Sequence, residues 1–131
     1  MAEKILVVDD EPEVGDAIAD LLRSDGYAPE TSTDSVAAVK LLSAVAYDLV
    51  LSDIVMPGLT GLQLLSLIKA RIPAPEVILM TGYSTSERAM EALEHGAFAF
   101  IKKPFDATEL LERVKQALWK RKLALGRDLD V

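Results

Sequence analysis

The stretch YDLVLSDIVMPG, residues 47–58, joins the pattern of a buried strand to an acidic residue. Its apolar run LVL is typical of a strand with both faces covered, and the Pro-Gly pair that follows is a strong turn signal. Asp53 stands where that strand stops. A carboxylate is costly to hold at the end of a core strand without a partner. The stretch therefore predicts a central strand and a site that shares this acid.

The same alternation of apolar runs and helical patterns extends over the whole chain. We expect one helix to begin at Pro12 and stop at Gly26, another to begin at the candidate cap Asp34, and a last one to run from Asp106 toward Leu125. The other expected elements are strands at 4–8, 28–32, 49–52, 76–80 and 98–101, and helices at 61–71 and 85–96. Five β/α units in regular order predict an α/β, doubly wound fold with a five-stranded parallel sheet and right-handed crossovers.

Length and composition limit the class of protein. A chain of 131 residues fits one domain, and its 50% hydrophobic content suits a sheet covered on both faces by helices. The lack of cysteine rules out disulfides and thiolate metal sites. No apolar stretch reaches the roughly 20 residues of a membrane span, and the apolar run in MAEKILVVDD is too short for a signal peptide. These features favour a cytoplasmic protein that does not enter a membrane.

The charge balance argues against nucleic acid as a direct ligand. With 21 acidic and 14 basic residues the formal net charge is −7, and an acidic surface repels the phosphate backbone. Basic residues do gather late in the chain, where cations suit the C-terminal dipole of a long last helix. These residues are Arg113, Lys115, Lys120, Arg121, Lys122 and Arg127. We therefore interpret them as part of that helix rather than as a DNA-binding patch.

Polar residues follow four of the expected strands at the point where each strand ends. They are Asp9 and Asp10, then Asp53, then Thr81, then Lys102 and Lys103. The carboxyl ends of parallel strands share one edge of the sheet, where open α/β folds bind ligands. Three carboxylates within about 5 Å of each other would repel by about 3 kcal/mol per pair at an effective dielectric of about 20. A hard cation such as Mg²⁺ would offset this repulsion, and carboxylate, Mg²⁺ and lysine are together the parts of a phosphoryl-transfer site.

Each of these residues also has an ordinary structural explanation. An Asp-Asp pair after a strand is often a helix cap, and a single acid at a strand end is more often a loop residue than a nucleophile. A threonine before glycine is common in turns, and a Lys-Lys pair before proline is usually a solvated surface pair. Only their joint placement at one edge indicates a site.

The segments VVDDEP, LVLSDIVMPGLTG, ILMTG and FAFIKKPFD resemble the receiver domain of two-component response regulators. The resemblance covers residues 4–118, nearly the whole chain. Its spacings agree throughout: 44 residues from Asp9 to Asp53, 28 more to Thr81 and 22 more to Lys103. The resemblance implies a chemotaxis-regulator-like, flavodoxin-like (βα)5 sandwich with strand order 2-1-3-4-5. That order makes the second strand an edge, as Pro29 within it also indicates.

The resemblance also implies a role for each residue of this edge. Asp53 would accept a phosphoryl group from the phosphohistidine of a sensor histidine kinase or a phosphotransfer protein. Asp10 would bind Mg²⁺, or Mn²⁺ in its place, directly, and Asp9 would bind it largely through water. Asp53 and the Val55 carbonyl would complete the protein ligands. Lys103 would pair with the phosphoryl oxygens, and a cis bond is expected between it and the following proline.

Thr81 and Phe100 match the switch pair of receivers, in which the hydroxyl moves to the phosphoryl group and the ring follows inward. The signal is then expected to leave through the face of the fourth helix, fifth strand and fifth helix, where a homodimer or another partner would dock. Phe100 as an ordinary core residue is the alternative. Lys102 points to the other face of its strand by alternation and is expected only to be solvated.

Val55 and Tyr83 lie two residues beyond the phosphoacceptor and the switch threonine, where receivers border the path of the hydrolytic water. Valine has no group that orients a water. A tyrosine ring can cover the path of the water, although its hydroxyl could instead hold a water. The alternative is that both residues are loop positions without influence on hydrolysis. The pair predicts a long-lived phosphorylated state that suits a slow transcriptional response.

Three other classes of protein fit less well. A dinucleotide-binding enzyme would need Gly-x-Gly-x-x-Gly after the first strand, where this chain has DDEPEV. A haloacid-dehalogenase-like phosphatase would place its nucleophile and a second aspartate two residues apart, whereas Asp9 and Asp10 are adjacent. A non-phosphorylated interaction module with a receiver fold is opposed by the intact acids and lysine.

The receiver is expected to span residues 1–120, with 121–131 as a helical extension or linker toward an effector domain. It would be a signalling domain that catalyses only its own phosphorylation and dephosphorylation, not an enzyme acting on other substrates. We favour a receiver taken from a longer regulator over a single-domain regulator.

Overall fold

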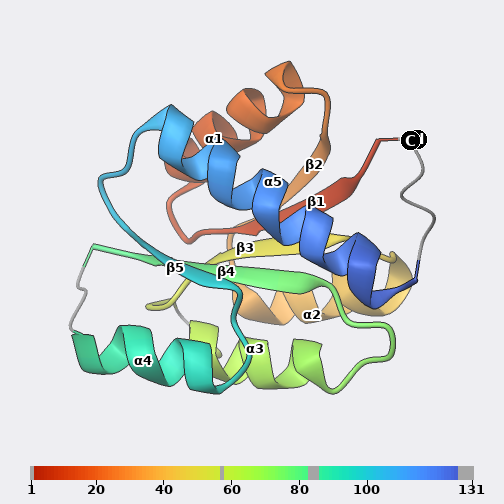
Figure 1. Ribbon diagram of the computed structural model, residues 1–131. Helices are drawn as coiled ribbons and strands as arrows, with labels where there is room; N and C mark the ends of the chain where they lie inside the picture. Colours follow the sequence, from red (N-terminus) through yellow and green to blue (C-terminus); the bar gives the residue numbers. More distant parts are fainter. Residues whose placement is uncertain (1, 57, 83–85, 127–131) are drawn as a thin grey trace.

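The computed structural model describes residues 2–56, 58–82 and 86–126 (Figure 1). Its strands are β1 (Lys4–Val8), β2 (Ala28–Ser32), β3 (Leu49–Asp53), β4 (Glu76–Thr81) and β5 (Ala99–Lys102). Its helices are α1 (Pro12–Ser24), α2 (Ser35–Ala44), α3 (Gly61–Lys69), α4 (Ser86–Glu94) and α5 (Ala107–Ala124). All neighbouring strands pair in parallel, in the order β2-β1-β3-β4-β5. The predicted α/β fold, strand order and edge position of β2 are confirmed.

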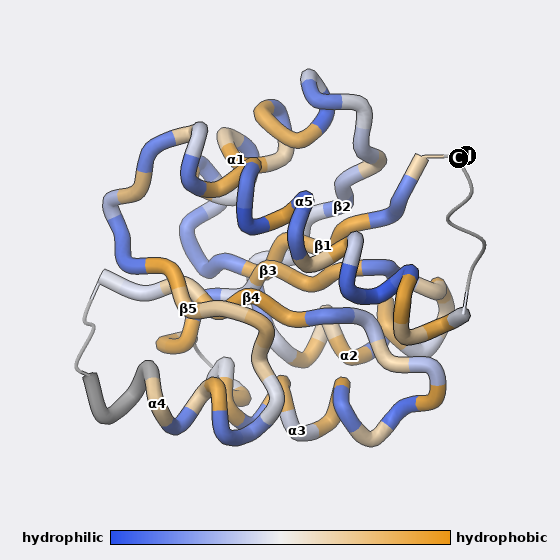
Figure 2. Tube along the Cα trace, in the orientation of Figure 1, coloured by the Kyte–Doolittle hydropathy of each residue, from blue (hydrophilic) through white to orange (hydrophobic). Residues whose placement is uncertain are grey.

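Two helical layers cover the sheet, with α1 and α5 on one face and α2, α3 and α4 on the other (Figure 1). The strands supply both cores by alternation. In β3, Val50 faces the α2–α3–α4 layer while Leu49 and Leu51 face α1 and α5, and all three are fully buried. Figure 2 shows apolar interior strands between helices in which apolar and polar residues alternate. This two-sided burial explains why the interior strands are apolar runs rather than alternating patterns.

Local signals in the sequence set the ends of the helices. Asp34 caps α2 by accepting a hydrogen bond from the Ala37 amide at 2.7 Å, and Asp106 caps α5 through the Glu109 amide at 2.7 Å. Thr60 and Gln63 form a capping box at the start of α3. Gly26, two residues after the end of α1, has the left-handed φ of +92° that commonly follows the last turn of a helix. Both predicted caps are confirmed.

Several element ends differ from their predicted positions by one or two residues. The strand β5 spans Ala99–Lys102 instead of 98–101, and α4 spans Ser86–Glu94 instead of 85–96. The strands β3 and β4 extend through Asp53 and Thr81, because the ladder continues there with the pairs Asp53–Met80 and Thr81–Lys102. The helix α3 ends at Lys69, two residues before its predicted end. Arg71 turns instead toward α2, where its Nη1 donates to the Leu42 carbonyl at 2.9 Å.

The far end of α5 is fastened to the body of the domain. Arg121 is 7% exposed, and its Nη1 lies 2.7 Å from Asp48 Oδ1. Asp48, directly before β3, also accepts a hydrogen bond from the Lys4 amide at 2.9 Å through Oδ2. The helix thus continues without a break past the expected boundary at residue 120. Among the described residues, no helix is both long and apolar enough to cross a membrane.

Candidate functional site

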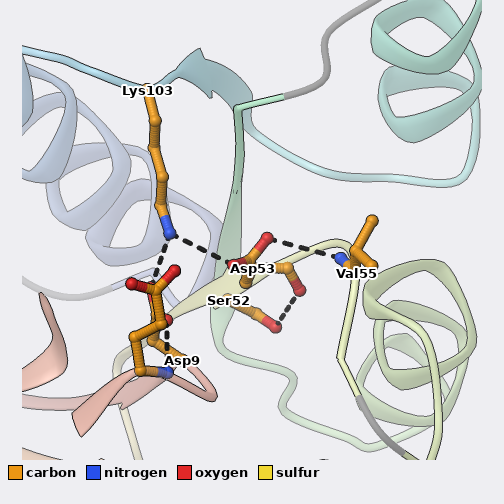
Figure 3. Close-up of polar contacts among 6 residues, drawn as sticks. Asp9, Ser52, Asp53, Val55 and Lys103 are labelled. Carbon is orange, nitrogen blue, oxygen red and sulfur yellow. Dashed lines mark hydrogen bonds and ion pairs between the residues drawn. The ribbon is translucent and has the colours of Figure 1, made fainter.

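The polar residues of the carboxyl edge meet where the strand order reverses. The chain passes from β1 to β2 on one side of β1, and after α2 it returns to β3 on the other side. Open α/β folds bind ligands at the carboxyl ends of the strands at such a switch point. Asp9 directly follows β1 and Asp53 is the last residue of β3. Figure 3 shows these two side chains and Lys103 converging at this point. The predicted meeting of acids and lysine is therefore present in the fold.

Strand alternation aims these side chains at one another. The residues two and four positions before Asp9, Asp53 and Lys103 pack in the α1–α5 core, so these three side chains share one side of the sheet. Lys103 Nζ lies 2.7 Å from Asp9 Oδ2 and 3.1 Å from Asp53 Oδ2. Lys102 is exposed, and by strand alternation its side chain lies on the opposite side of the sheet from that of Lys103, as expected. The bond between Lys103 and Pro104 is cis, as the resemblance implied.

Asp9, Asp10 and Asp53 form a group that can hold a metal ion. One carboxylate oxygen from each lies within 4.8 Å of the others. Asp9 is 1% exposed, Asp53 is 8% exposed, and Asp10 is exposed to solvent. Oxygen ligands with one open, solvated side are what Mg²⁺ prefers, because it keeps part of its water shell. The residues therefore fit this ion.

The three acids differ in how their oxygens are occupied. Asp9 bonds to Lys103 through Oδ2 and accepts from the Glu11 amide through Oδ1 at 3.0 Å. Asp10 has no hydrogen bond or ion pair within the part of the chain that the structure describes. Of the three acids, Asp9 thus has both carboxylate oxygens occupied by described residues, and Asp10 has neither.

The environment keeps Lys103 charged. Burial acts to lower the pKa of its ammonium group, but hydrogen bonds to Asp9 and Asp53 and the charges of both acids outweigh burial. The pKa of Lys103 is therefore raised above its ordinary value. A permanent cation 3.1 Å from the Asp53 carboxylate suits a site that receives an anionic group.

The expected switch residues lie on the other side of the sheet. Thr81 is 1% exposed, and Phe100, half-buried, packs against the α2–α3–α4 core. Phe100 pairs in register with Leu79, two residues before Thr81, so both side chains share that face. Val55 is 53% exposed, and its amide donates to Asp53 Oδ1 at 3.3 Å. Tyr83 lies outside the described residues.

Two structural supports of this site went unnoticed in the sequence. Gly61 passes so close to the phosphoacceptor strand that a Cβ on it would lie 2.5 Å from the Asp53 carbonyl oxygen. Ser52 donates to the same carbonyl at 2.9 Å. The sequence signal for Gly61 is only that a glycine follows a strand-end acid within a few residues. No local pattern indicates the role of Ser52.

Fold and site together define a doubly wound, flavodoxin-like domain with a lysine-bridged group of acids at its switch point. Residues 5–115 match the response regulator receiver domain, and the chain belongs to that family. Receiver domains are signalling domains that bind Mg²⁺ at an aspartate cluster, and the Asp9–Asp10–Asp53 group has this composition.

Named relatives are similar over most of this chain. It is 41% identical over 114 residues to the response regulator protein FleR of Pseudomonas aeruginosa, covering 87% of this chain and 24% of FleR. It is 36% identical over 114 residues to the DNA-binding transcriptional regulator NtrC of Escherichia coli, with coverage of 87% and 24%. The chain thus spans about a quarter of the length of these curated relatives.

A solved structure has the same fold at the size of one domain. The beryllofluoride-activated NtrC4 receiver domain dimer superposes with a TM-score of 0.86 at 30% identity. The superposition covers 90% of this chain and 98% of that one. The chain is therefore similar to a complete receiver domain.

Proposed function

We propose that Asp53 accepts a phosphoryl group from the phosphohistidine of a sensor histidine kinase or a phosphotransfer protein. The reaction would depend on Mg²⁺, or on Mn²⁺ in its place, and would take place in the cytoplasm. One observation carries it: Asp53 ends a central strand, is 8% exposed, lies 3.1 Å from Lys103 and groups with the acids Asp9 and Asp10. A carboxylate next to a lysine and a cation site is equipped to attack phosphorus.

In the proposed reaction an Asp53 carboxylate oxygen attacks the phosphorus atom. A new P–O bond forms while the P–N bond to the donor imidazole breaks, and the imidazole retains the electron pair. Asp10, Asp53 and the Val55 carbonyl would hold the Mg²⁺, with Asp9 acting through water. The ion supplies positive charge to the phosphoryl oxygens when bound.

The residues around Asp53 complete the proposed site. Lys103 would donate a hydrogen bond to a phosphoryl oxygen, and Thr81 would donate its hydroxyl to another. Because Lys103 Nζ already lies within hydrogen-bond distance of Asp53, the lysine needs little movement to reach a group attached there.

The experiment is incubation with Mg²⁺ and acetyl phosphate, followed by intact-mass measurement. We expect a gain of one phosphoryl group in the native protein and none in Asp53→Asn, whose side chain has similar size but is not a nucleophile. Asp16→Asn, an exposed acid on α1 outside the site, is the matched control and should still be labelled. Undiminished labelling of Asp53→Asn would refute the proposal.

We further propose that phosphorylation changes the surface of α4, β5 and α5, where a partner or a second copy would dock. Thr81 and Phe100 share the face covered by α4, and Met90 and Leu93 on that helix are 61% and 50% exposed. The similar NtrC4 receiver is a dimer when activated with beryllofluoride. A ligand shifts a conformational equilibrium only through better contacts in one state.

Beryllofluoride and Mg²⁺ together test this second step. Amide NMR shifts should change along α4, β5 and α5, and sedimentation should show association of the treated protein. Met90→Lys should reduce the association without altering labelling of Asp53. Shift changes confined to the loops around Asp53 would instead indicate a passive phosphoryl carrier.

Since its curated relatives are about four times as long, we infer that the chain acts as the receiver of a longer regulator. Its acidic net charge of −7 makes it unsuited to bind DNA by itself. Control of transcription would then be exerted by a neighbouring domain.

A further inference from the structure

The described part of the connection from β3 to α3, residues 54–56 and 58–60, lies beside the acids Asp9, Asp10 and Asp53 and contains Val55, whose amide donates to Asp53. Backbone hydrogen bonds fasten both ends of it: the Ile54 amide donates to the Met80 carbonyl at 3.0 Å, and the Gly61 amide donates to the Ile54 carbonyl at 2.7 Å. Between these ends, the Leu59 amide donates to Ser35 Oγ at 2.7 Å. This bond joins the connection to a helix that contributes no other side chain to the site.

Ser35 is a rigid anchor. It is the first residue of α2 and is fully buried. The residue before it, Asp34, is held by its cap to the Ala37 amide and by the Ser32 hydroxyl, which donates to the Asp34 carbonyl at 2.9 Å. A side chain fixed in this way can hold a loop in one position at little further entropic cost.

The backbone lies directly against the Ser35 hydroxyl. A Cβ on Gly58 would lie 2.9 Å from Ser35 Oγ, and Gly58 has the left-handed φ of +84°. Gly58 thus combines a close approach with a conformation that other residues rarely adopt. The loop is shaped to bring the Leu59 amide to this one oxygen.

We infer that Ser35 is a positioning residue for the cation site: by holding residues 58–59, it fixes the loop that presents the Val55 carbonyl to the acidic group. The inference rests on the proposed function, because Val55 as a metal ligand is part of that proposal. Removal of a group that orients a metal ligand, without binding the metal itself, commonly weakens metal binding.

Mg²⁺ titration of Ser35→Ala, followed by amide NMR at a temperature where the protein is folded, tests the inference. We expect Mg²⁺ to bind about tenfold more weakly than in the native protein. Ser35→Thr, which keeps an acceptor oxygen, should recover most of the affinity. The matched control is Ser66→Ala, because among the described residues the Ser66 hydroxyl bonds only to the Leu62 carbonyl of its own helix. Its Mg²⁺ affinity should be unchanged.

A second measurement needs no substitution. If Ser35 and the cation hold the same loop, each must favour the other, so saturating Mg²⁺ should slow hydrogen exchange of the Leu59 amide in the native protein. This measurement decides the matter if Ser35→Ala does not fold.

The outcomes separate this inference from the proposed function. A native protein that binds Mg²⁺ and is labelled at Asp53, together with a Ser35→Ala variant of equal affinity, would overturn the role of Ser35 alone. A hydrogen-exchange rate of the Leu59 amide that does not change with Mg²⁺ would also overturn the role of Ser35. A native protein that neither binds Mg²⁺ nor takes a phosphoryl group would overturn both.

Discussion

Lys103 lies closer to Asp9 than to the proposed phosphoacceptor, with Nζ distances of 2.7 Å to Asp9 and 3.1 Å to Asp53. The Asp9 side chain is completely buried, whereas that of Asp53 is 12% exposed. Without a cation from solvent, the lysine is thus the main counter-charge for two buried acids. It ties β1, β3 and the end of β5 together at the switch point.

Replacement of Lys103 by methionine should destabilise the metal-free protein by about 2 kcal/mol, because hydrogen bonds to two charged partners are lost. Saturating Mg²⁺ should remove part of this loss, since the cation restores positive charge among the acids. Urea unfolding with and without Mg²⁺ measures both effects. Lys102→Met, the exposed neighbour, should unfold like the native protein. A similar loss in both variants would contradict this account.

Asp10→Asn should bind Mg²⁺ at least about tenfold more weakly, because a hard cation loses a charged ligand. In the absence of metal the variant should melt at a higher temperature than the native protein, since one source of repulsion is removed. Calorimetric titration and thermal unfolding give the two values. Asp16→Asn, an exposed acid on α1, should change neither. An Asp10→Asn variant with native affinity and no gain in melting temperature would show that the three acids are not energetically coupled.

Val55→Asn should shorten the lifetime of phosphorylated Asp53 by about fivefold, the rate equivalent of one water-orienting hydrogen bond of about 1 kcal/mol. The reason is that valine, 53% exposed beside Asp53, offers no polar group to a water in line with phosphorus. Loss of phosphoryl label in Mg²⁺, without kinase or phosphatase, is the measurement. Val36→Asn is the control, because Val36 is also 53% exposed. Equal lifetimes of native protein and Val55→Asn would refute this reading of Val55.

Tyr47→Phe should extend the stability of the protein toward alkaline pH. Burial first, and then the negative charge of Glu30, raise the pKa of Tyr47 to about 12. A phenol in the unfolded chain titrates near pH ~10. Between these two pH values the folded protein keeps the phenol proton and unfolding releases it, so the free energy of unfolding falls as pH rises. Phenylalanine has no such proton, so the variant does not lose this stability. Urea midpoints from pH 7 to pH 11 test it; parallel curves for both proteins would contradict the prediction.

The sequence predicted the interior of the fold well because burial on both faces leaves a direct trace in composition. The runs at β1, β3 and β4 are apolar without interruption. Once the sheet is parallel, the acids at the ends of β1 and β3 must meet the lysine that follows β5. The ends of β3 and β4 were less predictable, because their last residues are polar. Whether Asp53 and Thr81 join the ladder depends on the neighbouring strand, which no local pattern reveals.

Contacts between distant segments were the part that sequence reasoning could not supply. Arg121 was expected to be one of several cations suited to a helix end, yet it is buried against Asp48, 73 residues away. The bond from Leu59 to Ser35 spans 24 residues and depends on how α2 packs. Such pairs arise from the packing of layers, and residue type alone does not single them out.

The Arg121–Asp48 pair sets a practical limit on where the chain can be divided. A fragment ending at residue 120 would keep most of α5 but leave Asp48, whose side chain is 21% exposed, without its cation. Loss of one partner from such a pair costs about 3 kcal/mol, a large share of the stability of a small domain. Fusions, reporters and shortened versions should therefore be joined beyond Ala124, where α5 ends. Any module attached there would inherit a helix already fastened to the strand that carries Asp53.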